Sequence, residues 1–149
     1  MNRQEFFANI SQEAIDVNGH KVPSPTCLRK GSAMLGVYPA LWHKVAALMP
    51  DSSFVPLMVG PDLTLCIINA FDLLETDMGP YREIGMIFPI TFEKNMFMKI
   101  SSLARDFFKV LFSNFSAYLY TMPVNDEASR VAGTDFWGFP KFLADVDLQ

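Results

Sequence analysis

Residues 133–142 read Gly-Thr-Asp-Phe-Trp-Gly-Phe-Pro-Lys-Phe, and they place one lysine, Lys141, among aromatic side chains directly after a proline. Two interpretations of this stretch are open. In the first, the aromatic residues pack a core while the lysine stem passes along them and carries its charge to water. In the second, the apolar surroundings desolvate the amine, which disfavours the charged form and leaves a neutral nucleophile. The second interpretation makes Lys141 a candidate catalytic residue.

A second unusual stretch lies earlier in the chain, where residues 78–83 read Met-Gly-Pro-Tyr-Arg-Glu. Gly and Pro are typical of a tight turn, and we expect this turn to deliver Glu83 into the start of a strand. A glutamate at the start of a strand is commonly solvated. This stretch therefore indicates a site only in combination with residues 133–142.

The composition describes a globular protein and excludes several classes of function. Of the 149 residues, 50% are hydrophobic and 19% are charged, which excludes disorder. The net charge is −4 and no run of Lys or Arg occurs, so the basic surface that nucleic-acid binding requires is missing. We see no basic leader followed by a long apolar run and no apolar run long enough to cross a bilayer. We therefore expect a cytoplasmic protein that binds neither nucleic acid nor membrane.

The common catalytic and metal-binding motifs are also missing from the sequence. There is no G-x-G-x-x-G, no phosphate loop and no G-x-S-x-G around a nucleophilic serine. His20 and His43 have no carboxylate or cysteine at ligand spacing, and Cys27 and Cys66 lie far apart, so we expect ordinary histidines and reduced thiols. Lysine and carboxylate chemistry is therefore the main catalytic option.

Hydrophobic periodicity predicts helices and strands that are intermixed without regular β-α-β alternation. A period of 3.6 residues predicts helices at 2–15, 39–50 and 93–115, and a shorter helix at 125–132 that Gly133 ends. Alternation of apolar and polar residues predicts strands at 53–59, 63–71, 82–92 and 116–124. We therefore expect an α+β fold with a curved, mostly antiparallel sheet.

We expect residues 1–149 to form a single domain. The segment from Phe142 to Leu148 begins another apolar and polar pattern, which stops at Gln149. A domain normally packs something onto its last element, so this ending predicts a domain that is truncated at its C-terminus or an edge that a partner covers. The fourteen Phe and nine Met further predict apolar faces for partner subunits, and hence a homo-oligomer.

Taken together, the two unusual stretches resemble the acetoacetate decarboxylase family. A G-P-Y-x-E motif at 79–83, a later strand with a short helix, and a G-x-x-x-W-G-F-P-K motif at 133–141 follow one another as in that family. The resemblance covers residues 31–145, and the lysine motif is its most specific part. It implies the α+β fold of the family, a curved sheet or partial β-barrel, into which the helix at 93–115 looks inserted.

The resemblance also implies an activity and a set of site residues. In the family, the lysine of the Pro-Lys motif forms a Schiff base with the substrate and the glutamate of the turn motif lines the same pocket; by motif position these are Lys141 and Glu83. The implied enzyme is a carbon–carbon lyase that decarboxylates a small β-keto acid such as acetoacetate. It needs no metal or organic cofactor, because the protonated imine is itself the electron sink. Further candidates for substrate contact are Tyr81, Arg29, Trp137 and Phe139.

The sequence departs from the family pattern at several positions. Phe142 stands where the family has a second lysine, so Lys141 depends on desolvation for a neutral amine. The family's other pocket glutamate falls near Ile68, and Arg29 is offset from the aligned arginine. These departures leave two alternatives open. One is a different imine reaction on the same fold, such as an aldol condensation or a dehydration. The other is a non-catalytic remnant that binds a small carbonyl compound or only assembles.

Overall fold

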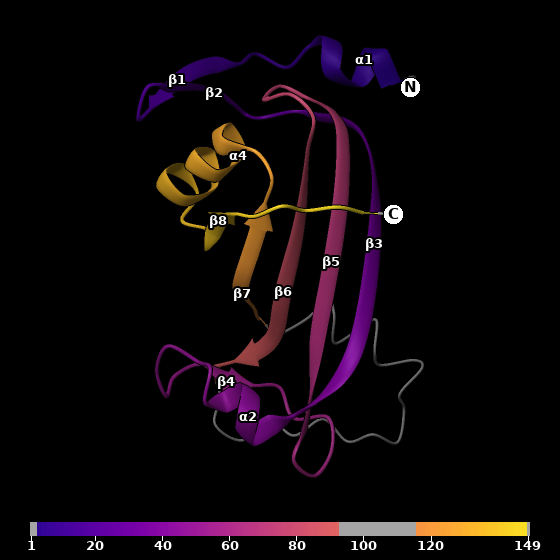
Figure 1. Ribbon diagram of the computed structural model, residues 1–149, viewed down its shortest axis with the longest axis vertical. Helices are drawn as coiled ribbons and strands as arrows, with labels where there is room; N and C mark the ends of the chain where they lie inside the picture. The colour runs from indigo at the N-terminus through magenta and orange to yellow at the C-terminus, as the bar shows by residue number, and fades with distance from the viewer. Residues whose placement is uncertain (1–2, 93–115, 149) are drawn as a thin grey trace. The chain divides into compact units, whose positions relative to one another are not determined.

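The computed structural model describes residues 3–92 and 116–148, and strands are its main elements (Figure 1). In chain order the elements are α1 (Arg3–Ala8), β1 (Glu13–Val17), β2 (His20–Ser24), β3 (Leu28–Leu41), α2 (Trp42–Ala46), β4 (Val55–Pro56), β5 (Leu63–Thr76), β6 (Tyr81–Thr91), β7 (Ser116–Val124), α4 (Glu127–Val131), the π-helix η2 (Ala132–Phe136) and β8 (Lys141–Leu143). The described chain divides into two compact units. The first contains the chain up to Met34, Ala70–Ile84 and the chain from Thr121 onward; the second contains Leu35–Asn69 and the described part of Gly85–Tyr120.

The larger sheet has the strand order β3-β5-β6-β7-β8, and β4 pairs with β6 beside this path. β4 and β6 are antiparallel. β5 and β6 are joined by the short turn at 77–80, which requires an antiparallel pair because parallel strands need a long crossover. β8 pairs with β7 in the parallel direction. The predicted α+β class is therefore confirmed, and the path of the described strands, which begins at β3 and ends at β8, is an open sheet and not a closed barrel.

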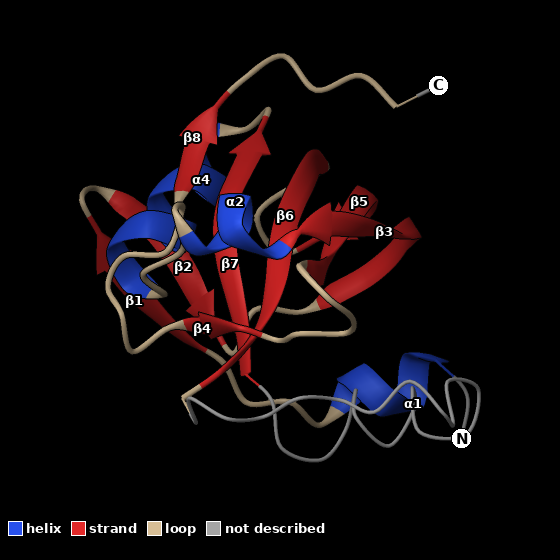
Figure 2. Ribbon diagram, turned by 90° about the horizontal axis from the view of Figure 1, so that it is seen from below, coloured by secondary structure: helices blue, strands red, loops and turns tan. Residues whose placement is uncertain are grey.

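β1 and β2 form a separate antiparallel hairpin, which corrects the predicted helix at 2–15 (Figure 2). Helix α1 ends at Ala8, and the residues from Glu13 onward are extended and pair with 20–24. Asn18 and Gly19 have φ values of 50° and 83°. A two-residue type I′ turn requires positive φ at both central residues, and Asn-Gly supplies it at little cost. Gly19 therefore forms part of the hairpin turn between β1 and β2.

β3 is a long strand that hydrophobic periodicity does not predict. It includes Pro39 and continues to Leu41, so the predicted helix at 39–50 is reduced to the short helix α2. Most residues of β3 are exposed, and its sequence consequently lacks the clear alternation that marks a half-buried strand. β3 is also the terminal strand of the described sheet path, where a proline without an N–H is tolerated.

The four predicted strands are present, three of them with altered ends. The strand predicted at 116–124 coincides with β7, and those at 63–71 and 82–92 correspond to β5 and β6. Within 53–59, only Val55 and Pro56 form the strand β4. The predicted helix at 93–115 lies outside the described residues. Among the helices that the structure describes, none has the length and apolar character to cross a membrane.

In the first unit, two buried clusters set the positions of the strands and of the helical segment α4–η2. One cluster joins the hairpin to that segment and consists of Val17, Val22, Val131 and Ala132. The other joins three neighbouring strands of the sheet and consists of Leu73, Tyr81 and Val124. Met78, in the turn after β5, packs against both clusters. Burial of these apolar side chains is the main stabilising contribution to this unit.

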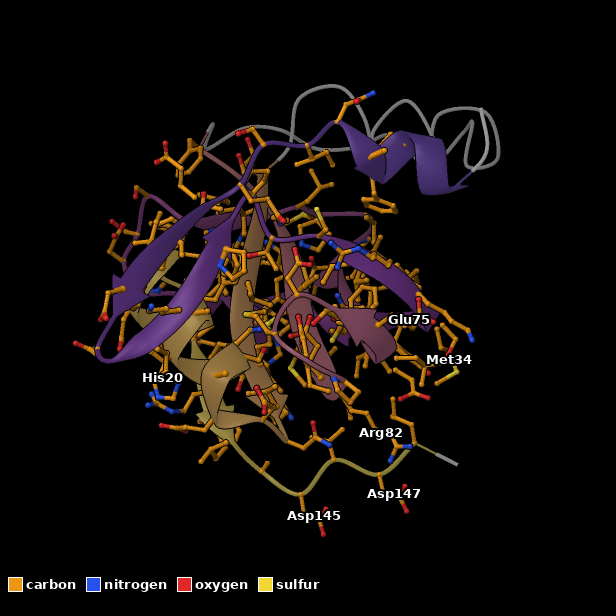
Figure 3. All side chains as sticks on the ribbon, turned by 90° about the horizontal axis from the view of Figure 1, so that it is seen from above. His20, Met34, Glu75, Arg82, Asp145 and Asp147 are labelled. Carbon is orange, nitrogen blue, oxygen red and sulfur yellow. The ribbon has the colours of Figure 1, made fainter. Side chains whose placement is uncertain are left out.

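Arg82 connects the C-terminal segment to the sheet within the first unit. Its guanidinium lies 2.9 Å from the carboxylate of Asp72 and 3.4 Å from that of Asp147 (Figure 3). The hydrogen bond to Asp72 is the main cause that raises the pKa of Arg82. Because these side chains are partly exposed, solvent screens both ion pairs and each contributes little to stability.

In the second unit, aromatic side chains pack against one another beside α2. The ring of Phe54 makes edge contacts with the rings of Phe92 and Tyr118, each with centroids 5.5 Å apart. The indole N–H of Trp42 donates to the carbonyl of Pro56 at 2.8 Å, which connects the start of α2 to β4. None of the residues that form the candidate site belongs to this unit.

Candidate active site

Lys141 opens β8, and its amine lies inside the first unit. The residue pairs with Met122 of β7, and only 8% of it is exposed. Its Nζ donates to Glu83 Oε2 at 2.7 Å and to Ser129 Oγ at 2.9 Å. Nζ also lies 5.4 Å from the centre of the Tyr81 ring, within the range of a cation–π interaction. The buried amine is therefore surrounded by a carboxylate, a hydroxyl and an aromatic face.

Tyr81 and Glu83 reach this amine from the first residues of β6. Side chains two residues apart on a strand point to the same face of the sheet, so both are directed toward Lys141. The turn that precedes them contains Gly79 with a φ of 92°, as the turn chemistry of this stretch predicts. Both residues are buried. A buried carboxylate is costly unless it is paired, and Lys141 supplies the pairing charge for Glu83.

Ser129 completes the polar contacts of the amine and comes from α4. The residue is fully buried. Its backbone N–H donates to the side chain of Asp126 at 2.7 Å, so Asp126 caps the helix in the usual way. This cap fixes the first turn of α4 and with it the direction in which Ser129 Oγ faces Lys141.

Gly133 provides the surface along which the lysine stem passes. It lies four residues after Ser129 and therefore on the same side of the helical segment. A Cβ placed on Gly133 would lie 2.7 Å from Lys141 Cε and 2.9 Å from Lys141 Cγ. The lysine stem thus occupies the space that any side chain at position 133 would need.

Gly133 does not end the helix, which corrects the predicted helix end. The chain continues as the π-helix η2, in which the N–H of Trp137 donates to the carbonyl of Ala132 at 3.2 Å. Phe139 then folds back, and its N–H donates to the carbonyl of Gly133 at 2.7 Å. Single π-helical turns occur frequently at functional sites. Here the wider turn brings the Pro-Lys motif back over Gly133.

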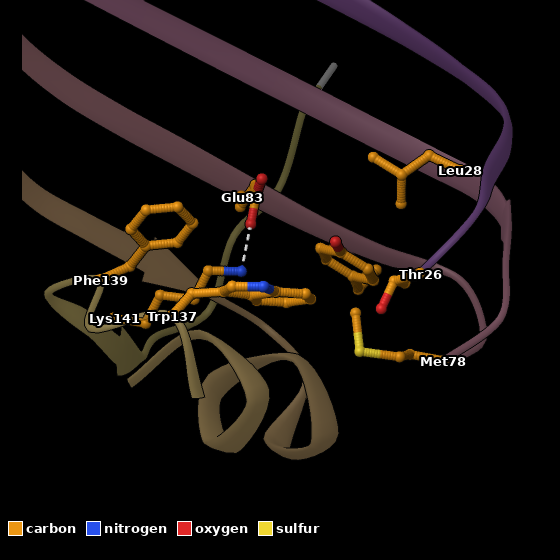
Figure 4. A pocket seen from close by; sticks show the side chains of 8 residues that line it. Thr26, Leu28, Met78, Glu83, Trp137, Phe139 and Lys141 are labelled. Carbon is orange, nitrogen blue, oxygen red and sulfur yellow. Dashed lines mark hydrogen bonds and ion pairs between the residues drawn. The ribbon is translucent and has the colours of Figure 1, made fainter. Parts of the chain in front are cut away.

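A cavity of about 260 Å³ in the first unit contains these groups. Its lining consists of Thr26, Leu28, Met78, Tyr81, Glu83, Trp137, Phe139 and Lys141. Figure 4 shows Glu83 and Lys141 beside Trp137 and Phe139, with Thr26, Leu28 and Met78 at the opposite side. A largely apolar lining with a few convergent polar groups is typical of a small-molecule site.

The surroundings of Tyr81 keep its phenol neutral. Burial, and after it the negative charge of Glu83, raise the pKa of Tyr81 to about 12, although a hydrogen bond with Ser129 opposes this shift. At neutral pH the side chain is therefore an uncharged aromatic wall with a hydroxyl group. Tyr81 can contact a ligand, but it does not supply a negative charge.

Arg29 is not among the residues that line this cavity. Its guanidinium pairs with Asp77, which also accepts hydrogen bonds from the N–H of Cys27 at 2.8 Å and from Gln12 at 2.5 Å. Burial opposes the negative charge of Asp77, but these hydrogen bonds and Arg29 together lower the pKa of that carboxyl group. The guanidinium is thus engaged with the turn after β5. Of the residues singled out in the sequence, Tyr81, Glu83, Trp137, Phe139 and Lys141 meet in one cavity.

Ser129, Thr26 and Leu28 belong to neither of the two unusual stretches in the sequence. A signal for Ser129 exists, because Asp126 and Ser129 have the spacing of an N-cap and its bonded residue. Helical periodicity also puts Ser129 and Gly133 on one face, toward the Pro-Lys motif. No comparable signal marks Leu28, because it begins a strand that the periodicity does not predict.

This geometry allows two chemical tasks. Glu83 Oε2 lies at 2.7 Å from Lys141 Nζ, within the reach required of a group that takes or returns a proton. A lysine amine that has lost its proton can attack a carbonyl carbon and form an imine. The cavity in front of the amine offers a place for the carbonyl compound.

Comparisons with known proteins agree with this picture. The family model described as acetoacetate decarboxylase (ADC) matches residues 19–149. The chain is also similar to the crystal structure of acetoacetate decarboxylase from Legionella pneumophila subsp. pneumophila str. Philadelphia 1, with 16% sequence identity and a TM-score of 0.53. The match covers 76% of this chain and 36% of that one, so this chain spans about a third of the length of the matched structure. No curated protein matches the sequence.

Proposed function

This chain belongs to the acetoacetate decarboxylase family, and we propose that it is a Schiff-base-forming lyase that decarboxylates a small β-keto acid through Lys141. The observation that carries the proposal is the buried contact between Lys141 Nζ and Glu83 Oε2 at the wall of an apolar cavity. A lysine and a glutamate held together in a cleft and shielded from water are typical of a site for proton transfer and covalent catalysis.

The reaction begins with the transfer of a proton from Lys141 to Glu83. The neutral amine attacks the ketone carbon, and a bond forms between Nζ and that carbon while the carbonyl oxygen takes up a proton. Loss of water gives a protonated imine. The bond between the α-carbon and the carboxylate carbon then breaks, carbon dioxide leaves, and its bonding electrons move into the iminium to form an enamine. Protonation of the enamine carbon and hydrolysis of the imine release the ketone and restore the amine.

Each surrounding residue has a role in this proposal. Glu83 accepts the first proton and returns one to the enamine, because it is the carboxylate within reach of Nζ. Ser129 holds the amine, and Tyr81 forms an uncharged wall. Trp137 and Phe139, which line the cavity and are partly exposed, contact the substrate. No metal or organic cofactor takes part, because the protonated imine accepts the electrons.

The departures from the family pattern do not remove these groups. Phe142 follows Lys141 in β8, and successive strand side chains point to opposite faces, so Phe142 lies on the other face of the strand. Consistent with this, it is half-exposed whereas Lys141 is buried. Glu83, at 2.7 Å from Nζ, is therefore the proposed acceptor of the proton that the amine must lose before it attacks.

Borohydride trapping tests the proposal. The protein is incubated with acetoacetate and reduced with borohydride, and the adduct is located by peptide mass spectrometry, together with a measurement of released carbon dioxide. We expect the adduct on Lys141. Lys141→Arg should abolish it, because a guanidinium stays charged and cannot form the imine. Lys44→Arg, at an exposed lysine of α2, is the matched control and should trap like the unsubstituted protein.

Three outcomes would change the assignment. Adducts spread evenly over many lysines, or none in a folded sample, would contradict the proposed role of Lys141 and favour a non-catalytic protein. An adduct on Lys141 without release of carbon dioxide would keep the imine chemistry but replace the reaction with a condensation or dehydration. Trapping that survives Lys141→Arg would assign the nucleophile to another residue.

A further inference from the structure

The cavity has a reactive side and an apolar side. Figure 4 shows the ion pair of Lys141 and Glu83 at one side, and Leu28 and Met78 at the other. A ketone carbon that reacts must approach Nζ, and the reactive side therefore fixes the position of that carbon. A substituent on the far side of that carbon then extends toward Leu28 and Met78.

Apolar side chains around this cavity are left in contact with water. Leu28 is 50% exposed, Phe139 42% and Trp137 39%. Covering apolar surface is favourable in proportion to its area, so a ligand that reaches these side chains gains binding free energy that a smaller one does not. The exposed apolar lining therefore favours a ligand with an apolar part.

The hydroxyl group of Thr26, at the far side of the cavity, already has a hydrogen-bond partner. The hydroxyl of Thr26 donates to the carbonyl of Pro23 at 2.6 Å, so its donor is not available to a ligand. The neighbouring thioether of Met78 is flexible and polarisable, and such side chains adapt to apolar groups of different shape. A polar substituent would lose hydrogen bonds to water at this side of the cavity, whereas an alkyl or aryl chain would not.

We infer that the preferred substrate is a β-keto acid with an apolar chain of several carbons beyond its ketone group, and that acetoacetate, which has only a methyl group there, binds more weakly. The inference rests on the proposed imine chemistry at Lys141 and deepens it by naming the class of substrate. The ketone carbon lies at Nζ, and the chain extends to the other side of the cavity, where it covers Leu28 and Met78. Acetoacetate would leave this part of the cavity filled with water.

A series of straight-chain β-keto acids tests the inference on the full chain. Acetoacetate, 3-oxohexanoate and 3-oxooctanoate are each titrated, the imine is trapped with borohydride, and the adduct on Lys141 is quantified by mass spectrometry. Each methylene that becomes buried should lower the half-saturating concentration by about fourfold. Counting only the adduct on Lys141 excludes acids that adhere to apolar surface elsewhere.

Substitutions of Leu28 identify the side of the cavity that recognises the chain. Leu28→Ala removes apolar surface, and Leu28→Gln keeps most of the volume but makes it polar. Both should lower the preference for 3-oxooctanoate over acetoacetate, by about tenfold for the Gln variant. Because Leu28 is half-exposed, neither change threatens the fold. Leu48→Ala, at a comparably exposed leucine that does not line the cavity, should keep the original preference.

The outcomes separate this inference from the proposed function. If all three acids label Lys141 with the same half-saturating concentration, the inferred substrate class is wrong while the imine chemistry stands. If the preference for a long chain is unchanged in both Leu28 variants, the inferred placement of that chain against Leu28 and Met78 is wrong. If no acid labels Lys141 in a folded sample, both the proposed function and the inferred substrate class are wrong.

Discussion

Gly133 has no room for a side chain, because the stem of Lys141 lies where its Cβ would be. An added Cβ would come within 2.7 Å of Lys141 Cε and 2.9 Å of Lys141 Cγ. These are atoms from the middle of the lysine side chain, whose end is held by Glu83 and Ser129. The stem therefore cannot move aside unless the amine gives up its contacts.

Gly133→Ala should consequently displace the amine of Lys141. We expect a loss of about 1–3 kcal/mol in the free energy of unfolding, which is typical of overpacking. We also expect borohydride trapping to slow by up to about a hundredfold, because the amine is misplaced by the added methyl group. Denaturant titration and trapping rates measure the two effects.

Gly19→Ala is the matched control for this substitution. Gly19 has a φ of 83° and nothing within 4 Å of an added Cβ, so Ala there strains the hairpin turn without touching the site. It should reduce stability by about 1 kcal/mol and leave the trapping rate per folded molecule unchanged. Equal trapping rates for Gly133→Ala and Gly19→Ala would show that the stem of Lys141 does not depend on Gly133.

Ser129→Ala removes the hydroxyl that accepts a hydrogen bond from Lys141 Nζ at 2.9 Å. Ser129 is fully buried, so water cannot replace the lost acceptor without a local opening. Hydrogen bonds to charged groups contribute about 1.5–3 kcal/mol, and we expect a loss of stability in that range by denaturant titration. Ser53→Ala, at an exposed serine bonded to Asp51, is the control and should cost less than about 1 kcal/mol. Similar losses for both would contradict a structural role for the buried bond.

The pairing of Lys141 with Glu83 can be tested with a double-mutant cycle. Glu83→Gln and Lys141→Met each leave one buried partner without its opposite charge and should each cost about 3–5 kcal/mol. The double variant should cost clearly less than the sum, because no unpaired charge remains. The exposed pair of Glu127 and Arg130, also at 2.7 Å, is the control, and Glu127→Gln should cost much less than either buried substitution because solvent screens this pair. Additive losses at the buried pair would mean that its two charges are not coupled.

More of the candidate site than of the surrounding fold could be predicted from the sequence. Lys141 and Glu83 lie in short stretches whose turn and aromatic chemistry is visible without knowledge of any contact. That these two side chains lie close together is implied by the order of the two motifs in the sequence and not by hydrophobic periodicity. Ser129 and Gly133 share one helical face, which the sequence also indicates. A glycine after a helical segment, however, usually marks the end of the helix. The π-helix has no established sequence signal, and it made that interpretation wrong.

The elements that periodicity missed are those whose environment does not repeat along the chain. β3 is exposed at most of its positions and is a terminal strand, so its residues are not sorted by burial. The apolar residues of the β1 and β2 hairpin also fit a helical period. Only the Asn-Gly turn distinguishes a hairpin from a helix in this stretch. By contrast, β7 alternates clearly, and its bounds were predicted without error.

The hydroxyl of Tyr81 should make the stability of the protein depend on pH in the alkaline range. Burial, and then the charge of Glu83, raise its pKa in the folded protein to about 12, above the ordinary value of 10.0. The unfolded chain therefore loses this proton first, and between these two values the folded state binds more protons than the unfolded state. The contribution of Tyr81 to stability is present in full below about pH 10 and is lost as the pH rises through about 12.

Denaturant titrations across this range, with Tyr81→Phe as the comparison, measure that contribution. The phenylalanine variant has no proton to lose at this position, so its free energy of unfolding should fall less steeply than that of the unsubstituted protein between about pH 10 and 12. The difference in tyrosinate absorbance between the two proteins follows the ionisation of Tyr81 directly, and its midpoint should lie near 12. A midpoint near 10, or parallel loss of stability in both proteins, would show that Tyr81 is not shielded by the cavity wall and by Glu83 as the structure requires.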